Sequence, residues 1–165
     1  GRGPGIRLTD DSGTLRDEVY AILEIIGERD MTLASGHISP SEAKLLFKEA
    51  KARRVRRMIA THPREVATID EQREMISLGA YLEYSFLSCM PSDEGMSPQQ
   101  LLAALRNLGV EHCIVTTDLG QWMNPPPAEG MRMAIAAMLQ HGMIPEQVST
   151  LVKVNPSRLL GIGSP

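Results

Sequence analysis

The fold is decided by two short stretches and by the helix between them: residues 33–42, LASGHISPSE, and residues 58–63, MIATHP. Each stretch starts with an apolar run that leads to a histidine, which is His37 in the first and His62 in the second. Short apolar runs that are bounded by turn residues are typical of buried strands. The two stretches therefore predict a strand, a helix and a second strand, with a histidine after each strand.

The connecting helix has a clear start signal. Ser39 precedes Pro40, and Glu42 follows at the third helical position, which is the pattern of a capping box with proline in the first turn. Its apolar positions, which recur at helical spacing, are Ala43, Leu46, Phe47 and Ala50. A helix that returns the chain to the same sheet makes the two strands parallel, and their carboxyl ends then meet at one edge. We expect His37 and His62 at that edge, where α/β proteins place their ligand sites.

The same unit recurs along the chain. A helix capped by Thr14 is expected before the first strand, and its predicted buried stripe is Leu15, Val19, Ile22 and Ile26. Further strands are predicted at 80–84 and 113–117, and further helices at about 70–78, 98–108 and 128–140. The last of these helices should bury Met131, Ile135, Met138 and Leu139. The pattern predicts an α/β protein of repeated β-α units with parallel strands, forming a single domain over residues 1–165.

Composition limits the class of protein. The chain has 165 residues, 42% of them hydrophobic and 22% charged, as an ordinary soluble globule does, and it has no run of apolar residues long enough to span a membrane. The net charge of −3 argues against a nucleic-acid partner. The basic run RRVRR at 53–57 is interpreted as a solvated helix end, with an anion-binding or nucleic-acid-binding patch as the alternative. Two cysteines, Cys89 and Cys113, and no visible signal peptide favour a cytoplasmic location and make a catalytic thiol unexpected.

The strand ends carry the side chains that suggest chemistry, namely His37, His62, Glu83 and Asp118. Two imidazoles and a carboxylate suit zinc or a similar divalent ion, and an ion with three protein ligands keeps a place for a water whose pKa it lowers to about 7. A lone histidine at a strand end is more often a hydrogen-bonded structural residue, but its recurrence in successive units favours ligands. Glu83 has three open roles, which are to orient a ligand, to bind substrate or to pair with an arginine. Trp122 and Asn124, in a proline-rich loop, are expected to shape the substrate pocket.

These motifs resemble a known group of enzymes. The Gly36-His37 pair, the segments THP (61–63) and TDLG (117–120), and the closing NPSRLLG (155–161) are similar to the carboxyl-terminal half of amidohydrolase-superfamily metal hydrolases. The similarity spans about residues 5–162 and is greatest to an uncharacterised branch related to phosphotriesterase-type enzymes. It implies the second half of a (β/α)₈ TIM barrel, from the fifth strand to the eighth. It also implies that His37 and His62 bind one metal ion, and that Asp118 binds a metal ion and accepts a proton from the attacking water.

The chain departs from this family pattern in what it lacks. The HxH pair of the first strand and the bridging lysine or glutamate of the fourth strand are not in the sequence, and a whole barrel needs roughly 200 residues or more. Half a barrel exposes strand edges and an inner face. We therefore expect either a homo-oligomer or pairing with a missing amino-terminal half.

Two functions from different classes follow. The first is a metal-dependent hydrolase that uses zinc, or manganese or iron, on a small-molecule lactone, ester, amide or phosphoester. The second is a metal-free structural or regulatory half-barrel subunit. A phosphoesterase of the histidinol-phosphatase type would need further histidine ligands, because His112 and His141 fall at a strand start and a helix end and are interpreted as structural.

Overall fold

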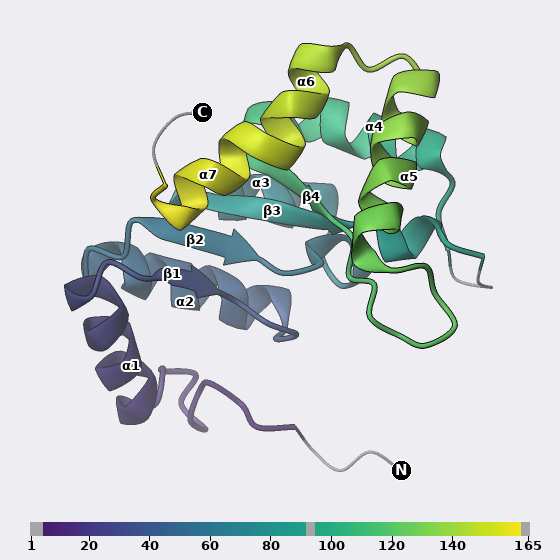
Figure 1. The fold of residues 1–165 in the computed structure, drawn as a ribbon. Coiled ribbons are helices and arrows are strands. Elements are labelled where there is room, and N and C mark those ends of the chain that lie inside the picture. The colour runs from purple at the N-terminus through teal and green to yellow at the C-terminus, as the bar shows by residue number, and fades with distance from the viewer. Residues whose placement is uncertain (1–4, 92–94, 163–165) are drawn as a thin grey trace. The chain divides into compact units, whose positions relative to one another are not determined.

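Strands and helices alternate along the chain, as Figure 1 shows for this computed structural model, which describes residues 5–91 and 95–162. The prediction of repeated β-α units with parallel strands is confirmed. The chain divides into two compact units, Gly1–Ala80 and Tyr81–Pro165, and each is described by itself. No helix in the described ranges is both long enough and apolar enough to cross a lipid bilayer.

The first unit contains the two stretches with the histidines. Its elements are α1 (Asp17–Glu28), β1 (Thr32–Ala34), α2 (Pro40–Ala52), β2 (Arg57–Ala60), a 3-10 turn (Pro63–Glu65) and α3 (Ile69–Leu78). β1 and β2 pair in parallel, with Leu33 opposite Met58 and Ala34 opposite Ile59. Parallel pairing brings both carboxyl ends to the same edge, so the expected placement of the histidines is confirmed at the level of the backbone.

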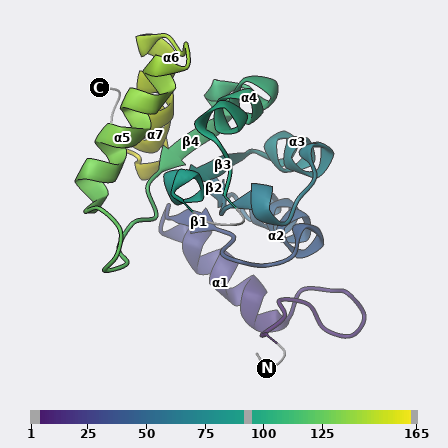
Figure 2. The ribbon, with the colours of Figure 1, turned by 90° about the vertical axis from the view of Figure 1, so that its right-hand side faces the viewer.

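Helix α2 follows the sequence pattern closely. The Ser39 side chain accepts a hydrogen bond from the Glu42 amide at 3.3 Å, and the buried residues of the helix are the predicted Ala43, Leu46, Phe47 and Ala50. Figure 2 shows α2 and α3 side by side, and Lys44 of α2 lies 2.9 Å from the carboxylate of Glu74 on α3. Apolar burial on one face thus fixes α2 against the strands, while an ion pair on the other links it to α3.

Helix α1 departs from the prediction. It begins at Asp17 rather than after Thr14, because the Asp10 carboxylate accepts hydrogen bonds from the amides of Ser12 and Thr14 and holds that segment in a turn. The predicted buried stripe is also wrong at Ile22, which is 54% exposed. The buried residue of the helix is Leu23, one position further along.

The second unit starts within a strand. Its elements are β3 (Ala80–Ser85), a 3-10 turn (Phe86–Cys89), α4 (Pro98–Leu108), β4 (Cys113–Thr116), α5 (Pro127–Gln140), α6 (Pro145–Ser149), a π-helical turn (Thr150–Val154) and α7 (Asn155–Leu160). β3 and β4 are parallel, with Glu83 opposite Ile114 and Ser85 opposite Thr116. The predicted burial of α5 is confirmed for Met138 and is wrong for Leu139, which is 44% exposed.

The Asn155 side chain links the start of α7 to the start of β4. Its side chain is fully buried, and its amide nitrogen donates to the carbonyl oxygens of Val110 at 2.9 Å and Cys113 at 2.7 Å. A buried polar group is tolerated only where hydrogen bonds compensate its loss of water. Asn155 therefore acts as a polar anchor inside an otherwise apolar core.

Candidate functional site

His37 and His62 lie side by side at the carboxyl edge of the β1–β2 pair. The offset of 25 residues that relates the two strands also relates Gly36 to Thr61 and His37 to His62. The imidazole rings are stacked, with 5.6 Å between centroids and 29° between ring planes. His37 is exposed and His62 is half-buried. The structure thus brings together two of the three predicted ligands.

Hydroxyl groups tie the two strand ends together immediately before the histidines. The Thr61 amide donates to the Ser35 hydroxyl at 3.0 Å, and the Gly36 amide donates to the Thr61 hydroxyl at 3.3 Å. The Ser35 hydroxyl donates in turn to the Gly36 carbonyl at 3.2 Å. Each histidine is therefore preceded by a segment whose hydrogen bonds depend on a side chain of the other strand.

The backbone turns sharply at two of the predicted ligands. His62 has a φ of 44° and Asp118 a φ of 52°, both in the left-handed region that side chains other than glycine rarely occupy. Such conformations cost of order 1–3 kcal/mol and concentrate at sites where the surrounding structure needs them. Asp30 and Arg54, which lie in turns away from these strand ends, share the left-handed conformation, so the feature accompanies the candidate ligands without being specific to them.

Asp118 lies just beyond β4 in a loop that its own side chains organise. The Gln121 amide nitrogen donates to the Asp118 carbonyl at 3.1 Å, and the Gln121 side-chain oxygen accepts hydrogen bonds from the Gly120 amide at 3.2 Å and from Asn124 at 2.7 Å. Thr117, like Ser35 and Thr61, uses its hydroxyl near a strand end, where it accepts from the Leu119 amide at 3.5 Å. Asn124 thus belongs to the same loop network as the Asp118 backbone.

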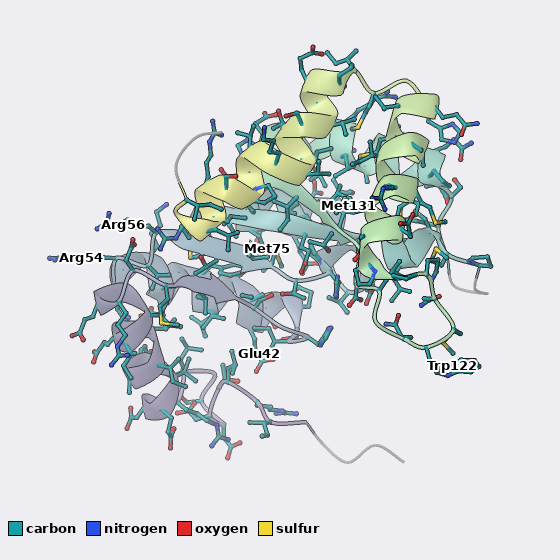
Figure 3. The ribbon with its side chains drawn as sticks, in the orientation of Figure 1. Glu42, Arg54, Arg56, Met75, Trp122 and Met131 are labelled. Atoms are coloured by element: carbon teal, nitrogen blue, oxygen red, sulfur yellow. The ribbon has the colours of Figure 1, made fainter. Side chains whose placement is uncertain are left out.

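Trp122 is the most exposed part of this loop. Its side chain lies at the outer tip between β4 and α5, as Figure 3 shows, and it is 92% exposed. Its neighbour Met123 is 66% exposed, so two adjacent large apolar side chains of this loop face water. The predicted role of Trp122 in binding substrate is compatible with this position and stays a prediction.

Glu83 does not lie at a strand end. β3 continues for two residues beyond it to Ser85, so the half-buried Glu83 side chain sits inside the strand, opposite Ile114. The residue that ends β3 is Ser85, whose hydroxyl accepts a hydrogen bond from the Leu87 amide at 3.2 Å. Glu83 therefore remains a candidate for substrate contact from within the sheet rather than from its edge.

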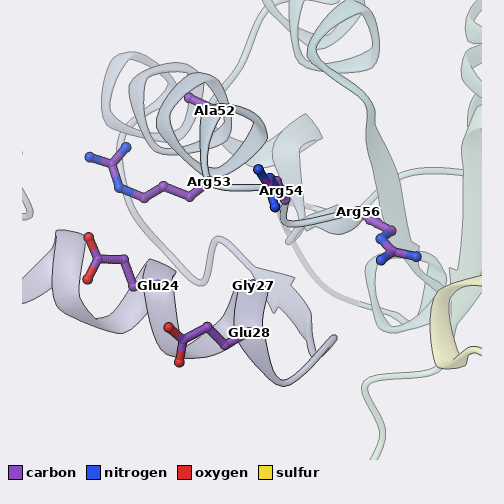
Figure 4. A pocket seen from close by; sticks show the side chains of 7 residues that line it. All are labelled: Glu24, Gly27, Glu28, Ala52, Arg53, Arg54 and Arg56. Carbon is purple, nitrogen blue, oxygen red and sulfur yellow. The ribbon is translucent and has the colours of Figure 1, made fainter.

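The basic run ends helix α2, as the sequence indicated. Arg53 donates to the carboxylate of Glu49 at 2.7 Å and stacks over the ring of Tyr20, 4.4 Å from its centroid. Arg54, Arg56 and Arg53 line a charged depression together with Glu24 and Glu28 of α1 (Figure 4). Because carboxylates and guanidinium groups share this depression, it lacks the uniform positive charge that anion binding needs.

Within residues 5–91 and 95–162, no group of three or more histidine, cysteine, aspartate or glutamate side chains is arranged to hold a metal ion.

Of the two cysteines, Cys113 is buried, and this burial, together with the negative charge of Glu111, raises the pKa of its thiol to about 12. A thiol with so high a pKa stays protonated at neutral pH and is a poor nucleophile.

Sequence reasoning missed three residues that the structure places around the candidate ligands, namely Ser35, Thr61 and Gln121. A signal was present for the first two, since a hydroxyl residue precedes each histidine within two positions. Gln121 carried no signal, because its role depends on the path of the loop.

Comparison with known proteins gives a family but no activity. The chain matches no curated protein. The family of unknown function DUF6282 matches residues 1–83, a range that holds the histidine pair and ends before Asp118. Because this match covers half of the 165 residues, the chain belongs to DUF6282, a family of unknown function.

Proposed function

We propose that this chain is a metal-dependent hydrolase in which His37 and His62 bind a divalent ion, zinc in the first place and manganese or iron otherwise. The observation that carries the proposal is the pair of imidazoles, 5.6 Å apart at the carboxyl ends of two parallel strands. Asp118 is proposed as a further ligand and as the general base, as the resemblance to amidohydrolases implies.

The donor pair fits a metal ion in chemistry and in spacing. Two imidazoles whose nitrogens lie ~2.0–2.1 Å from one tetrahedral zinc ion have ring centroids roughly 5 Å apart. The observed 5.6 Å between the centroids of His37 and His62 is close to that separation.

In this proposal each of the site residues has a separate role. His37 and His62 hold the ion through ring nitrogens, and the carboxylate of Asp118 takes the proton that the attacking water loses. A bound ion supplies a water with its pKa lowered to about 7 and polarises the oxygen of the substrate. Trp122 and Asn124 contact the organic part of a lactone, ester, amide or phosphoester, and Glu83 binds a polar group of it.

Zinc titration of the metal-free protein by calorimetry tests the proposal. Replacing His37 or His62 by alanine should weaken zinc binding by more than the roughly 10–100-fold that loss of a merely supporting residue costs. His112→Ala is the matched control, because His112 is exposed and precedes β4 rather than following it. Zinc binding that survives both substitutions, or no binding of zinc, manganese or iron by the unsubstituted protein, contradicts the proposal.

A hydrolysis screen then tests the role of Asp118. The zinc-loaded protein is assayed on lactones, carboxyl esters, amides and phosphoesters, and Asp118→Asn should abolish whichever activity appears while leaving the fold intact by circular dichroism. Asn keeps the shape of the side chain and tolerates a positive φ, but it cannot accept the proton. Full activity of Asp118→Asn removes Asp118 as the base. A protein that contains no metal by elemental analysis and gains no thermal stability from added zinc or manganese would favour the structural or regulatory subunit instead.

Self-association stays part of the proposal. In the β1–β2 pair the side chains of Leu33, Met58 and Ala60 are buried, whereas Ala34 is exposed and Ile59 half-buried. Parallel sheets usually have both faces covered. We therefore expect a second copy, or further chain of the same barrel, to cover the open face, and light scattering that shows a monomer would exclude the second copy.

A further inference from the structure

A closed set of hydrogen bonds joins the ends of β1 and β2 just before the two histidines. Its members are the Thr61 amide on the Ser35 hydroxyl (3.0 Å), the Gly36 amide on the Thr61 hydroxyl (3.3 Å) and the Ser35 hydroxyl on the Gly36 carbonyl (3.2 Å). All three residues are half-buried. Both strand ends are therefore held by side chains and not by the sheet ladder alone.

The backbone by itself does not provide this connection. The sheet ladder reaches the Ser35 amide, which donates to the Ile59 carbonyl at 2.9 Å. Beyond it, Gly36 with a φ of 62° and His62 with a φ of 44° turn away from the extended conformation that ladder pairing needs. The hydroxyls of Ser35 and Thr61 replace the missing ladder bonds at this point.

The consequence for the histidines follows from their positions. Thr61 is bonded covalently to His62, and Ser35 lies two residues before His37, so a change in the gap between the strand ends moves the two rings apart. Ligating groups must be held within about 0.5 Å of the productive geometry. We infer that Ser35 and Thr61 are positioning residues that set the separation of His37 and His62. The effect of these hydroxyls on metal binding rests on the proposed function. Their effect on the separation of the two rings does not.

Zinc affinity gives the first test. Ser35→Ala and Thr61→Val remove the hydroxyls with little change of shape, and each should weaken zinc binding by about 10–100-fold, the usual cost of losing a supporting contact. Thr61→Ser keeps the hydroxyl and should restore binding. Ser77→Ala is the control, because the Ser77 hydroxyl bonds only its own helix, at the Glu74 carbonyl. Zinc binding by Ser35→Ala and Thr61→Val that is as tight as that of the Ser77→Ala protein overturns the inference.

A second measurement needs no metal and separates this inference from the proposed function. In the metal-free protein, nuclear Overhauser effects between the rings of His37 and His62 should be strong, and they should weaken in Ser35→Ala and Thr61→Val but not in Thr61→Ser. Exchange of the Thr61 amide should accelerate roughly fivefold to tenfold in Ser35→Ala, as expected for the loss of one hydrogen bond. If the rings stay in contact in both variants, the inference is wrong, even where zinc binding is confirmed. If zinc does not bind but the ring contact responds, only the hydrolase proposal fails.

Discussion

The rings of His37 and His62 are stacked at 5.6 Å between centroids, yet of the two residues only His62 holds its backbone in the left-handed region, with a φ of 44°. The two positions therefore differ in the backbone conformation that the residue must adopt. At His37 the side chain can be changed without relieving any strain of this kind. At His62 a change of side chain also changes the conformational cost of the turn that leads into Pro63.

Glycine and alanine substitutions at His37 and His62 should reveal this difference in backbone conformation. Glycine reaches positive φ without the 1–2 kcal/mol or so that a Cβ atom costs there, so His62→Gly should be more stable to urea than His62→Ala by about 1 kcal/mol. At His37 the order should reverse, because glycine only adds chain entropy, a loss of roughly 0.5–1 kcal/mol relative to alanine. Equal stabilities of His62→Gly and His62→Ala would show that the turn is not strained.

Acid should weaken the first unit through Glu71. Its carboxylate accepts the Thr68 amide at 2.9 Å and the Thr68 hydroxyl at 3.1 Å and lies 3.6 Å from Lys44, and these contacts, the amide bond first, lower its pKa from 4.5. A pKa that folding lowers gives stability that is complete above the unfolded value and is lost as the pH falls through the folded value. The melting temperature should therefore fall between about pH 5 and pH 3.

Glu71→Gln isolates this contribution, because glutamine keeps the capping box but has no charge to lose. Its melting temperature should depend less on pH over that range than the unsubstituted protein's does. Glu24→Gln, on the exposed face of α1, is the control for removing one carboxylate. An identical pH profile for Glu71→Gln and the unsubstituted protein would rule Glu71 out as a source of acid sensitivity.

Helix α2 and the β-α order could be predicted from the sequence because the information is local. The cap at Ser39 and the apolar spacing from Ala43 to Ala50 act within one helix, and neither depends on the rest of the fold. The start of α1 was predicted wrongly for a local reason too, since the Asp10 carboxylate accepts hydrogen bonds from the amides of Ser12 and Thr14 and holds Thr14 in the turn before the helix. A search for helix caps does not detect that turn.

The candidate site was predictable in its residue types and in the sheet edge at which its histidines lie, but not in its contacts. Parallel strands put His37 and His62 at one edge, but their stacking depends on the register, which the sequence does not state. The bond between Ser35 and Thr61 depends on the same register. Gln121 depends on the course of a loop, where no periodic pattern exists to be read.

Gly27 should not tolerate a side chain. A Cβ atom there would lie 2.4 Å from the backbone oxygen of Arg53, which cannot move without shifting the end of α2. Gly27→Ala should lower the free energy of unfolding by about 1–3 kcal/mol, although alanine favours helices. Gly120→Ala, where nothing lies within 4 Å, is the control and should be neutral or slightly stabilising in urea titrations. A stabilised Gly27→Ala protein would mean that α1 and α2 are not packed this closely.

Asn155 should be among the costliest polar residues to remove. Asn155→Ala would remove the donor from the buried carbonyl of Cys113, at about 1–3 kcal/mol, and also from the carbonyl of the half-buried Val110. A loss of a few kcal/mol is therefore expected in chemical denaturation, against less than about 0.5 kcal/mol for Gln99→Ala on the exposed face of α4. Similar small losses for both substitutions would show that water replaces the Asn155 side chain.

Trp122 offers a direct optical test of its loop, since it is the only tryptophan in the chain and is 92% exposed. Its fluorescence should be quenched by acrylamide as strongly in the folded protein as in urea, and Trp122→Phe should change the free energy of unfolding by less than about 0.5 kcal/mol. A substrate that the loop contacts must remove the indole from water, so binding should shift the emission to shorter wavelength and protect it from acrylamide. A substrate that is hydrolysed without any such change excludes Trp122 from substrate binding, because an indole that touches a ligand cannot keep its full exposure to the quencher.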